Sequence, residues 1–358
     1  MLTPAYRLTF TTKAGGAGGV LGAVASLAGS ALDGSGGKVV DTTKEPKAST
    51  VTDLVVSLDL DTPADSFTLV MGQVGKFRPQ RDNGVTIELG YADDDPSLTQ
   101  VMAGSVAAVE PGLLTSRVVG LNGADATLRT FVNETYEGQT AGAIVRALAG
   151  KAGVEVATAD DGIAFPAYVV DARRSVFAHM RDLAALCGFD LYINSDGKLV
   201  FQRFGNGNTV HTLEFAKHIV ALDVVRSPQA AARVEAWGES PAGGRADKAW
   251  AWLIKDFSSA HGTAGAGDPL LLLEKPALRT RDAATTAAEA AFAAVQRRAV
   301  RGDLLTFGQP LIKLGDAVKL QGLADDALNT TFQVRSVRHR ITKRGGFTTT
   351  IGFRSLGT

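Results

Sequence analysis

This sequence has almost no cysteine and no net charge, and each of these absences excludes a class of protein. Cys187 is the single cysteine among 358 residues, so no disulfide forms within the chain. It falls in an apolar helical pattern, which favours a buried, unreactive thiol and fits synthesis in the cytoplasm. The 37 basic and 37 acidic residues balance to a net charge of zero. We therefore expect no broad basic face and no nucleic-acid binding site.

Apolar runs long enough to cross a membrane are missing as well. The longest candidate, residues 20–32, is interrupted by glycine and serine and is shorter than the roughly 18 residues of a span. Lys13 in front of it is typical of a signal peptide, but cleavage there would remove residues 6–11, whose alternation predicts a strand. We expect neither a stable membrane span nor a signal peptide.

The residue patterns of common active sites are also absent. The glycine-rich segment is no P-loop, because Val39 follows Gly37-Lys38 where Ser or Thr is needed, and Leu21 stands where a dinucleotide fingerprint has its third glycine. No Gly-x-Ser-x-Gly elbow occurs. Five histidines are scattered singly, without the spacing of metal ligands: His179, His211, His218, His261 and His339. We predict no catalytic residue, no cofactor-binding residue and no metal site, and hence no enzyme.

Clusters of like charge have simpler interpretations than a ligand site. Acidic groups occur at residues 93–95, 160–161 and 325–326, each in an expected turn, where Asp side chains support the backbone. Paired carboxylate catalysis or calcium binding is the alternative interpretation. The basic run at residues 335–344 is expected to be a solvated strand and turn. If it has a function, it would contact an acidic neighbour in an assembly.

Alternating apolar residues fill the first third of the chain. Leu54, Val56 and Leu58 alternate with polar residues, as in a half-buried strand. Further strands are predicted at residues 6–11, 66–70, 85–91, 101–109 and 117–121. Residues 1–121 are predicted to form a first β-barrel tube domain, carrying a Gly/Ala-rich insertion at residues 14–50 that we expect to be a long loop.

The middle of the chain, residues 122–215, is predicted to be an α+β domain. Thr140 and Ser175 are expected to cap two amphipathic helices that end near Gly153 and at Gly188. Two strands follow, around a turn at residues 194–197 whose Asn-Ser-Asp-Gly sequence tolerates positive φ.

The remaining residues return to a β pattern. Strands are predicted at residues 219–225, 232–237, 317–321, 331–337 and 347–353, and an Ala-rich helix at residues 282–301 is expected to end at Gly302. Residues 216–240 and 303–358 are assigned to a second β-barrel tube domain, interrupted by an insertion at residues 241–302 that contains the helix. The predicted fold is mainly β, with two similar antiparallel barrels and smaller α+β domains.

An internal repeat links the two predicted barrels. Residues 87–94 align with 318–326 when one extra residue is allowed, Ser105-Val106 with Ser336-Val337, and residues 118–121 with 350–353. A chance likeness of short strands is the simpler alternative. If the barrel is duplicated, three copies of the chain present six similar surfaces, so a threefold ring matches a sixfold one.

Several motifs together resemble one family. They are TYEGQT at 135–140, YVVD at 168–171, SVF at 175–177, DLA at 182–184, GFDLY at 188–192, GKLVF at 197–201, LGDAV at 314–318 and VRSVRH at 334–339. Their order is similar to that of the phage late control protein D family of baseplate hubs, which includes the hub half of the valine-glycine repeat proteins of type VI secretion. Residues 14–50 and about 241–280 have no counterpart.

The resemblance implies a structural role in a contractile phage tail or phage-like injection system. It implies a homotrimer, a symmetry adapter that joins the hexameric inner tube to the central spike and meets baseplate wedge or other baseplate components. Such a chain is made in the bacterial cytoplasm and assembled into a virion tail or injection-system baseplate. Because type VI relatives continue into a further barrel and needle and this sequence ends at Thr358, a separate spike protein is expected.

Two other functions stay open. One is a tail-associated enzyme that degrades the cell wall, since hubs are often associated with lysozymes. The other is a carbohydrate-binding tail module that stacks sugars on Trp237, Trp250 and Trp252. Within the hub hypothesis, residues 14–32 are a candidate plug, clamp or interface.

Overall fold

The computed structural model describes residues 3–12, 38–43, 49–72, 78–93, 98–238 and 261–356. Most strands belong to one 13-stranded sheet in the order β14-β18-β21-β20-β3-β4-β7-β6-β5-β1-β2, with β19 pairing both β20 and β13. The bounds are β1 (Pro4–Thr11), β2 (Lys38–Asp41), β3 (Val51–Asp59), β4 (Ser66–Gly72), β5 (Gly84–Tyr91), β6 (Thr99–Pro111), β7 (Thr115–Asn122), β13 (Val210–Glu214), β14 (Ile219–Arg226), β18 (Val300–Phe307), β19 (Ala317–Gln321), β20 (Thr331–Thr342) and β21 (Gly346–Ser355). The expected mainly β fold with small α+β parts is confirmed.

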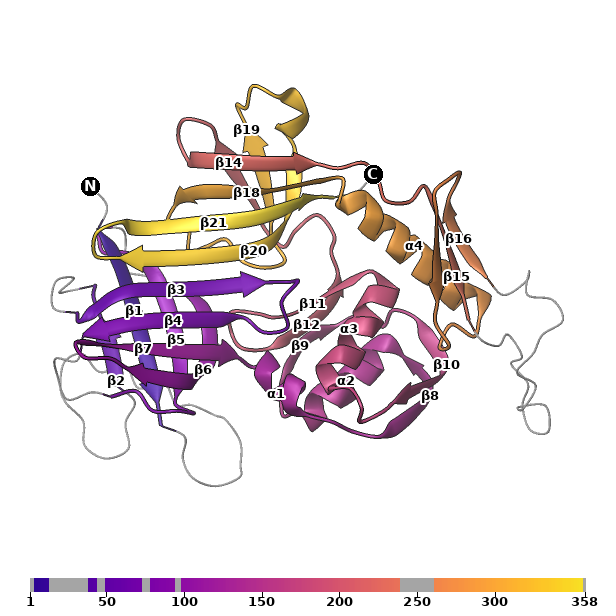
Figure 1. Ribbon diagram of the computed structural model, residues 1–358, viewed down its shortest axis with the longest axis horizontal. Coiled ribbons are helices and arrows are strands. Elements are labelled where there is room, and N and C mark those ends of the chain that lie inside the picture. Colours follow the sequence, from indigo (N-terminus) through magenta and orange to yellow (C-terminus); the bar gives the residue numbers. More distant parts are fainter. Residues whose placement is uncertain are drawn as a thin grey trace.

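Alternation along each strand decides which face is buried. In β3, Leu54, Val56 and Leu58 lie in the core, while the residues between them are partly exposed. Figure 1 shows β14, β18, β21, β20, β3, β4, β7 and β6 as one continuous layer, with β5 and β1 behind its lower part. One apolar core runs through the whole sheet.

The two halves of the sheet meet where β20 pairs with β3. These strands are antiparallel, with Ser336 opposite Asp59 at one end and Thr342 opposite Asp53 at the other. A chain segment near the C-terminus thereby completes the sheet begun by the N-terminal strands. We call this pairing the internal junction.

The two halves have the same strand order. The path β3-β4-β7-β6-β5 on one side is matched by β14-β18-β21-β20-β19 on the other. Register shifts fall at corresponding places: between Val51 and Asp53 in β3 and between Ile219 and Ala221 in β14. A second matching pair lies between Val106 and Ala108 in β6 and between Val334 and Ser336 in β20. Because bulges are local features of the ladder, their coincidence supports the repeat.

The bulges also correct the register of the alignment proposed from sequence. With the bulges superimposed, Val118 of β7 corresponds to Ile351 of β21, and both are fully buried. The sequence alignment set Val118 on Thr350, which is one residue away and on the opposite face. A slip of one residue exchanges the two faces of a strand, and the alternating pattern alone did not prevent it.

Two strands lie in a different sheet from the one expected. β13, predicted within the α+β region, pairs with β19 in the main sheet, and it does so in parallel, unlike the antiparallel pair β1 and β5. β15 (Arg233–Trp237), expected in the second barrel, lies in a small sheet between β16 (Gly262–Gly265) and β17 (Leu270–Glu274). The domain boundaries therefore stay a prediction.

The α+β part carries the expected caps. Its helices are α1 (Ala124–Arg129), α2 (Ala141–Lys151) and α3 (Val176–Cys187), and its strands are β8 (Glu134–Thr140), β9 (Val156–Ala159), β10 (Ala164–Val170), β11 (Phe189–Ile193) and β12 (Leu199–Arg203). The side chains of Thr140 and Ser175 accept hydrogen bonds from the first turns of α2 and α3, and Gly188 ends α3 with φ 68°.

The Ala-rich helix ends earlier than predicted. Helix α4 (Arg281–Arg297) packs its alanines on β15 and β16, and β18 begins at Val300. Gly302 lies inside β18 and does not cap the helix. A Cβ there would stand 2.3 Å from the carbonyl oxygen of Asp223 and 2.7 Å from the ring of Phe353, so the sheet requires a glycine at this position.

Residues 38–41 form β2 on the edge of β1, although the whole of residues 14–50 was expected to be loop. Residues 13–37 and 44–48 lie outside the described residues, as do Trp250 and Trp252.

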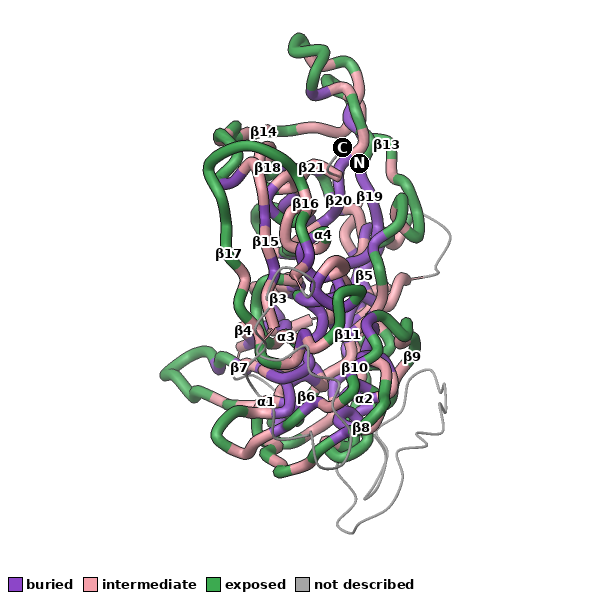
Figure 2. The backbone as a smooth tube through the Cα atoms, turned by 90° about the vertical axis from the view of Figure 1, so that its right-hand side faces the viewer, coloured by how far each residue is buried: buried purple, intermediate pink, exposed green. Residues whose placement is uncertain are grey.

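Figure 2 shows β17 as a largely exposed strand, and its Leu272 is 62% exposed. No helix in the described ranges is long and apolar enough to cross a membrane.

Candidate functional site: a polar junction between three parts of the chain

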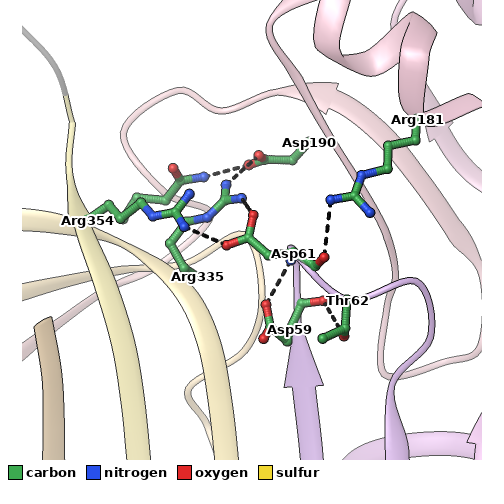
Figure 3. A network of polar contacts seen from close by, with 8 residues as sticks. Asp59, Asp61, Thr62, Arg181, Asp190, Arg335 and Arg354 are labelled. Atoms are coloured by element: carbon green, nitrogen blue, oxygen red, sulfur yellow. Dashed lines mark hydrogen bonds and ion pairs between the residues drawn. The ribbon is translucent and has the colours of Figure 1, made fainter. Parts of the chain in front are cut away.

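Charged side chains meet directly beside the internal junction, where β3 ends. Asp61 accepts hydrogen bonds from the side chains of Arg335 on β20, at 2.8 Å, and of Arg354 on β21, at 2.7 Å. Its backbone carbonyl accepts a further bond of 3.2 Å from Arg181 on α3. Figure 3 shows the carboxylate between the two guanidinium groups of the C-terminal strands. One residue thus connects both sheet halves and the α+β part.

Asp190 on β11 is the second acid of this polar junction. It accepts bonds of 3.0 Å from Arg335 and 2.6 Å from Gln333. The side chains of Arg335 and Asp190 are only 15% and 9% exposed. Arg335 therefore bridges two acids that belong to different parts of the chain, in a setting where little water replaces a lost contact.

The two acids respond differently to their surroundings. Burial raises the pKa of Asp61, but Arg335 and Arg354 outweigh it, so that the pKa lies below its ordinary value. For Asp190 burial is the larger effect and outweighs Arg335, so its pKa is raised. A buried ion pair adds little net stability, but removing one of its partners destabilises the fold by about 3–5 kcal/mol. The arrangement is suited to fixing orientation.

A third acid lies close to the polar junction. Asp65, on the loop before β4, is 4% exposed and accepts bonds from the backbone of Asp59, at 2.8 Å, and the side chain of Asn122, at 2.6 Å. Burial raises its pKa to about 7. It lines a small cavity between the first sheet half and the α+β part, together with Phe177 and Leu199. The cavity is lined mostly by apolar side chains.

The histidines singled out from the sequence are distributed over separate sites. His179 bonds the Asp171 carbonyl at 3.0 Å, and His211 bonds Asp316 at 2.9 Å. His218 accepts from the backbone of Glu214, His261 stacks on Trp237 and His339 bonds Thr349. Within the described part of the chain, no three His, Cys, Asp or Glu side chains gather as a metal site.

The acidic pairs take part in turns and surface contacts. Asp160 accepts from the backbone of Arg203, and Asp161 lies 3.4 Å from Arg146. Asp325 caps the short helix η2 (Asp326–Leu328) and pairs with Arg226 at 2.6 Å. In the group at 93–95, Asp94 and Asp95 lie outside the described residues.

The basic run was only partly interpreted correctly. Arg338, Arg340 and Arg344 are exposed, but Arg335 belongs to the polar junction and His339 is fully buried. Burial lowers the pKa of His339 to about 3, so this histidine is neutral. Sequence reasoning missed the polar junction because its acids lie far from Arg335 in the sequence. No local spacing indicates that Asp61 and Arg335 meet.

Cys187 and Trp237 have structural surroundings. The Cys187 thiol is buried and accepts a bond from the Ile163 backbone, and burial raises its pKa to about 11, as in an unreactive thiol. The Trp237 ring lies 4.5 Å from that of His261, nearly parallel to it. One of its faces is thus occupied.

The chain was compared with known proteins. No family model matches it, and no curated sequence is significantly similar. Solved structures match over its whole length. The 43 kDa tail protein of prophage MuSo2 from Shewanella oneidensis has a TM-score of 0.70 at 13% identity, covering 99% of both chains. The chain therefore has the fold of a phage tail protein.

Two further structures have this fold. A tail protein from Neisseria meningitidis MC58 matches with a TM-score of 0.67 at 13% identity, covering 99% of the chain and 96% of its own. The E. coli c3393 protein, a type VI secretion component with structural similarity to the phage T4 tail proteins gp27 and gp5, gives 0.58 at 10% identity, covering 85% of the chain and 73% of its own.

Proposed function

We propose that the chain is a structural component of a phage tail or related injection machine, and within it the baseplate hub. In this role it forms a trimer that joins the hexameric inner tube to the central spike, with further contacts to the baseplate wedge. The duplicated half-sheet carries the proposal: two halves with the same strand order and the same bulges lie within one chain. The fold shared with tail proteins supports it.

Duplication has a direct consequence for symmetry. A ring of three chains with two similar halves offers six similar docking surfaces, whereas a ring of three single barrels leaves every second surface of a hexamer unmatched. The polar junction fits this role, because Arg335 holds the halves and the α+β part in one orientation through Asp61 and Asp190. Six surfaces match a hexamer only when that orientation is fixed.

The proposed role is assembly and involves no catalysis. The cell-wall-degrading enzyme is disfavoured because the acids of the polar junction are engaged by Arg335, Arg354 and Gln333, whereas a glycosidase needs two carboxyls facing a substrate cleft. For the carbohydrate-binding module, His261 occupies one face of Trp237, while Trp250 and Trp252 lie outside the described residues. Hydrolysis of purified peptidoglycan by the isolated chain would contradict the assembly role.

The native mass of the purified chain tests the proposal, measured alone and with the candidate spike protein. We expect a species with three times the 37.3 kDa mass of one chain in at least one condition. A chain that stays monomeric or dimeric in both would remove the symmetry argument and put the binding module first.

A further inference from the structure

The internal junction has a counterpart that no strand of the described residues occupies. The bulge of β20 marks a change of partner: up to Gln333 the strand pairs with β19, and from Ser336 it pairs with β3. The corresponding strand β6 pairs with β5 up to Ser105, and beyond its bulge it pairs with β7. Among the described residues, the other edge of Ala108 to Pro111 carries no strand.

The second open edge belongs to β14, the counterpart of β3. β3 lies between β4 and β20, whereas β14 pairs with β18 and ends the sheet as far as the structure describes it. Figure 1 shows β14 at the upper and β6 at the lower end of the continuous layer. The two strands that would form the counterpart of the internal junction are thus at opposite ends of one chain, as a head-to-tail interface requires.

We propose that the β14 edge of one copy pairs, antiparallel, with the β6 edge beyond the bulge of the next copy, repeating the internal junction between chains. The inference rests on the proposed trimer and names its interface. Repeated three times, such a heterologous contact closes the layers of three chains into one ring of strands.

Burial at corresponding positions supports this pairing. At the internal junction Leu54, Val56 and Val337 are 1%, 0% and 0% exposed. Their counterparts at the open edges are Leu222, Val224 and Val109, and all three are only partly buried while still packed on the core. Within the ranges that the structure describes, no neighbouring strand covers these three side chains as it covers their counterparts, so pairing would bury them.

The backbone groups at the two edges are also complementary. Ser227 donates its N–H to Ala299 beside β18, so by alternation Val224 and Arg226 direct their N–H and C=O groups outward. Gly112 donates to Thr115 beside β7, so Val109 and Pro111 face outward on β6.

The register of the internal junction can be applied to the open edges by matching β6 to β20 and β14 to β3 at their bulges. In that register Val109 lies opposite Arg226 and Pro111 opposite Val224. Outward-facing groups then meet outward-facing groups. Pro111 has no N–H, so it accepts only, and this contact is shorter than the internal junction.

The transferred register also sets Glu110 opposite Val225, in the place of Arg338 opposite Ser57. Such a pair makes no hydrogen bonds to each other, and its Cα atoms lie about 4.5 Å apart, within the range of a disulfide. Glu110 and Val225 are both exposed, so neither substitution disturbs the core.

The test is oxidation of the full chain carrying Glu110→Cys and Val225→Cys. We expect disulfide-linked dimers and trimers on a non-reducing gel, at least tenfold more than with either single variant. The matched control combines Glu110→Cys with Val220→Cys, because Val220 is 52% exposed on the same strand but about five residues, or roughly 17 Å, from Val225. Cys187 is buried and remains in place.

A second pair of variants tests the backbone contact without cysteine chemistry. Arg226→Pro removes an outward N–H but no bond to β18, whereas Arg226→Ala loses only the Asp325 ion pair. We expect the proline variant to weaken association at least tenfold relative to the alanine variant, by analytical ultracentrifugation.

If the chain forms trimers, but the cysteine pair gives no crosslink and Arg226→Pro does not weaken association, the proposed interface is wrong and the hub proposal is unaffected. A monomer under every condition overturns both.

Discussion

Asp61 and Arg335 lie 274 positions apart in the sequence and 2.8 Å apart in the fold. The first follows β3 and the second lies at the bulge of β20, so the ion pair closes one end of the internal junction. Arg335 also reaches Asp190 in the α+β part. The stability of the whole arrangement should depend on these contacts more than on the exposed ion pairs.

Replacing Asp61 by Asn should lower the free energy of unfolding by about 1.5–3 kcal/mol, the usual contribution of hydrogen bonds to charged groups. The reason is that Arg335 and Arg354 lose a shared anion in a partly buried place. Urea unfolding measures the change. Asp53→Asn is the control, since it breaks the exposed pair with Arg340 and should cost below about 1 kcal/mol. Equal losses in the two variants would contradict the role of the polar junction.

The charge state of Asp65 should make stability depend on pH. Its folded pKa of about 7 lies above the unfolded value, so between about pH 4 and pH 7 the folded chain binds the extra proton and stability falls as pH rises. In Asp65→Asn this contribution is absent. The wild type should therefore lose on the order of 2 kcal/mol more than the variant between pH 5 and pH 8. Parallel pH profiles from denaturant unfolding would show that Asp65 ionises normally.

Gly120 should be irreplaceable on β7. A Cβ there would lie 2.1 Å from the Phe67 ring and 2.5 Å from the backbone oxygen of Ser105. Gly120→Ala should destabilise the protein by roughly 1–3 kcal/mol through overpacking. The matched variant is Gly150→Ala on α2, where the added methyl meets nothing within 4 Å and should stabilise by up to about 1 kcal/mol. Thermal unfolding distinguishes the two, and a shift of the same sign in both would refute the steric argument.

The cap of α2 offers a local test. The Thr140 hydroxyl accepts from the Ala143 N–H at 3.2 Å and also contacts Asp161. Thr140→Ala should cost about 0.5–2 kcal/mol, while Thr140→Ser keeps the oxygen and should recover most of the loss. Chemical denaturation would measure both variants, and an unaffected alanine variant would mean that water caps the helix equally well.

Local patterns predicted the elements because local physics forms them. Alternation identified β3, β5 and β7, and the capping residues Thr140 and Ser175 identified the first residues of α2 and α3. The end of α4 was predicted wrongly because glycine commonly terminates helices, and Gly302 follows the helical pattern. A glycine is needed at this position because Asp223 and Phe353 on neighbouring strands leave no room for a side chain.

The sequence by itself determined the class of the fold, the helices α2 and α3 and most of the strands, and it suggested a repeat, because hydrophobic periodicity and capping act over a few residues. Only the tertiary structure decided the register of the repeat, the sheet to which β13 and β15 belong, and the polar junction. Bulges shift pairing without changing the alternation, and the partners of Asp61 and Asp190 are chosen by strand pairing across the whole chain. No local pattern carries that information.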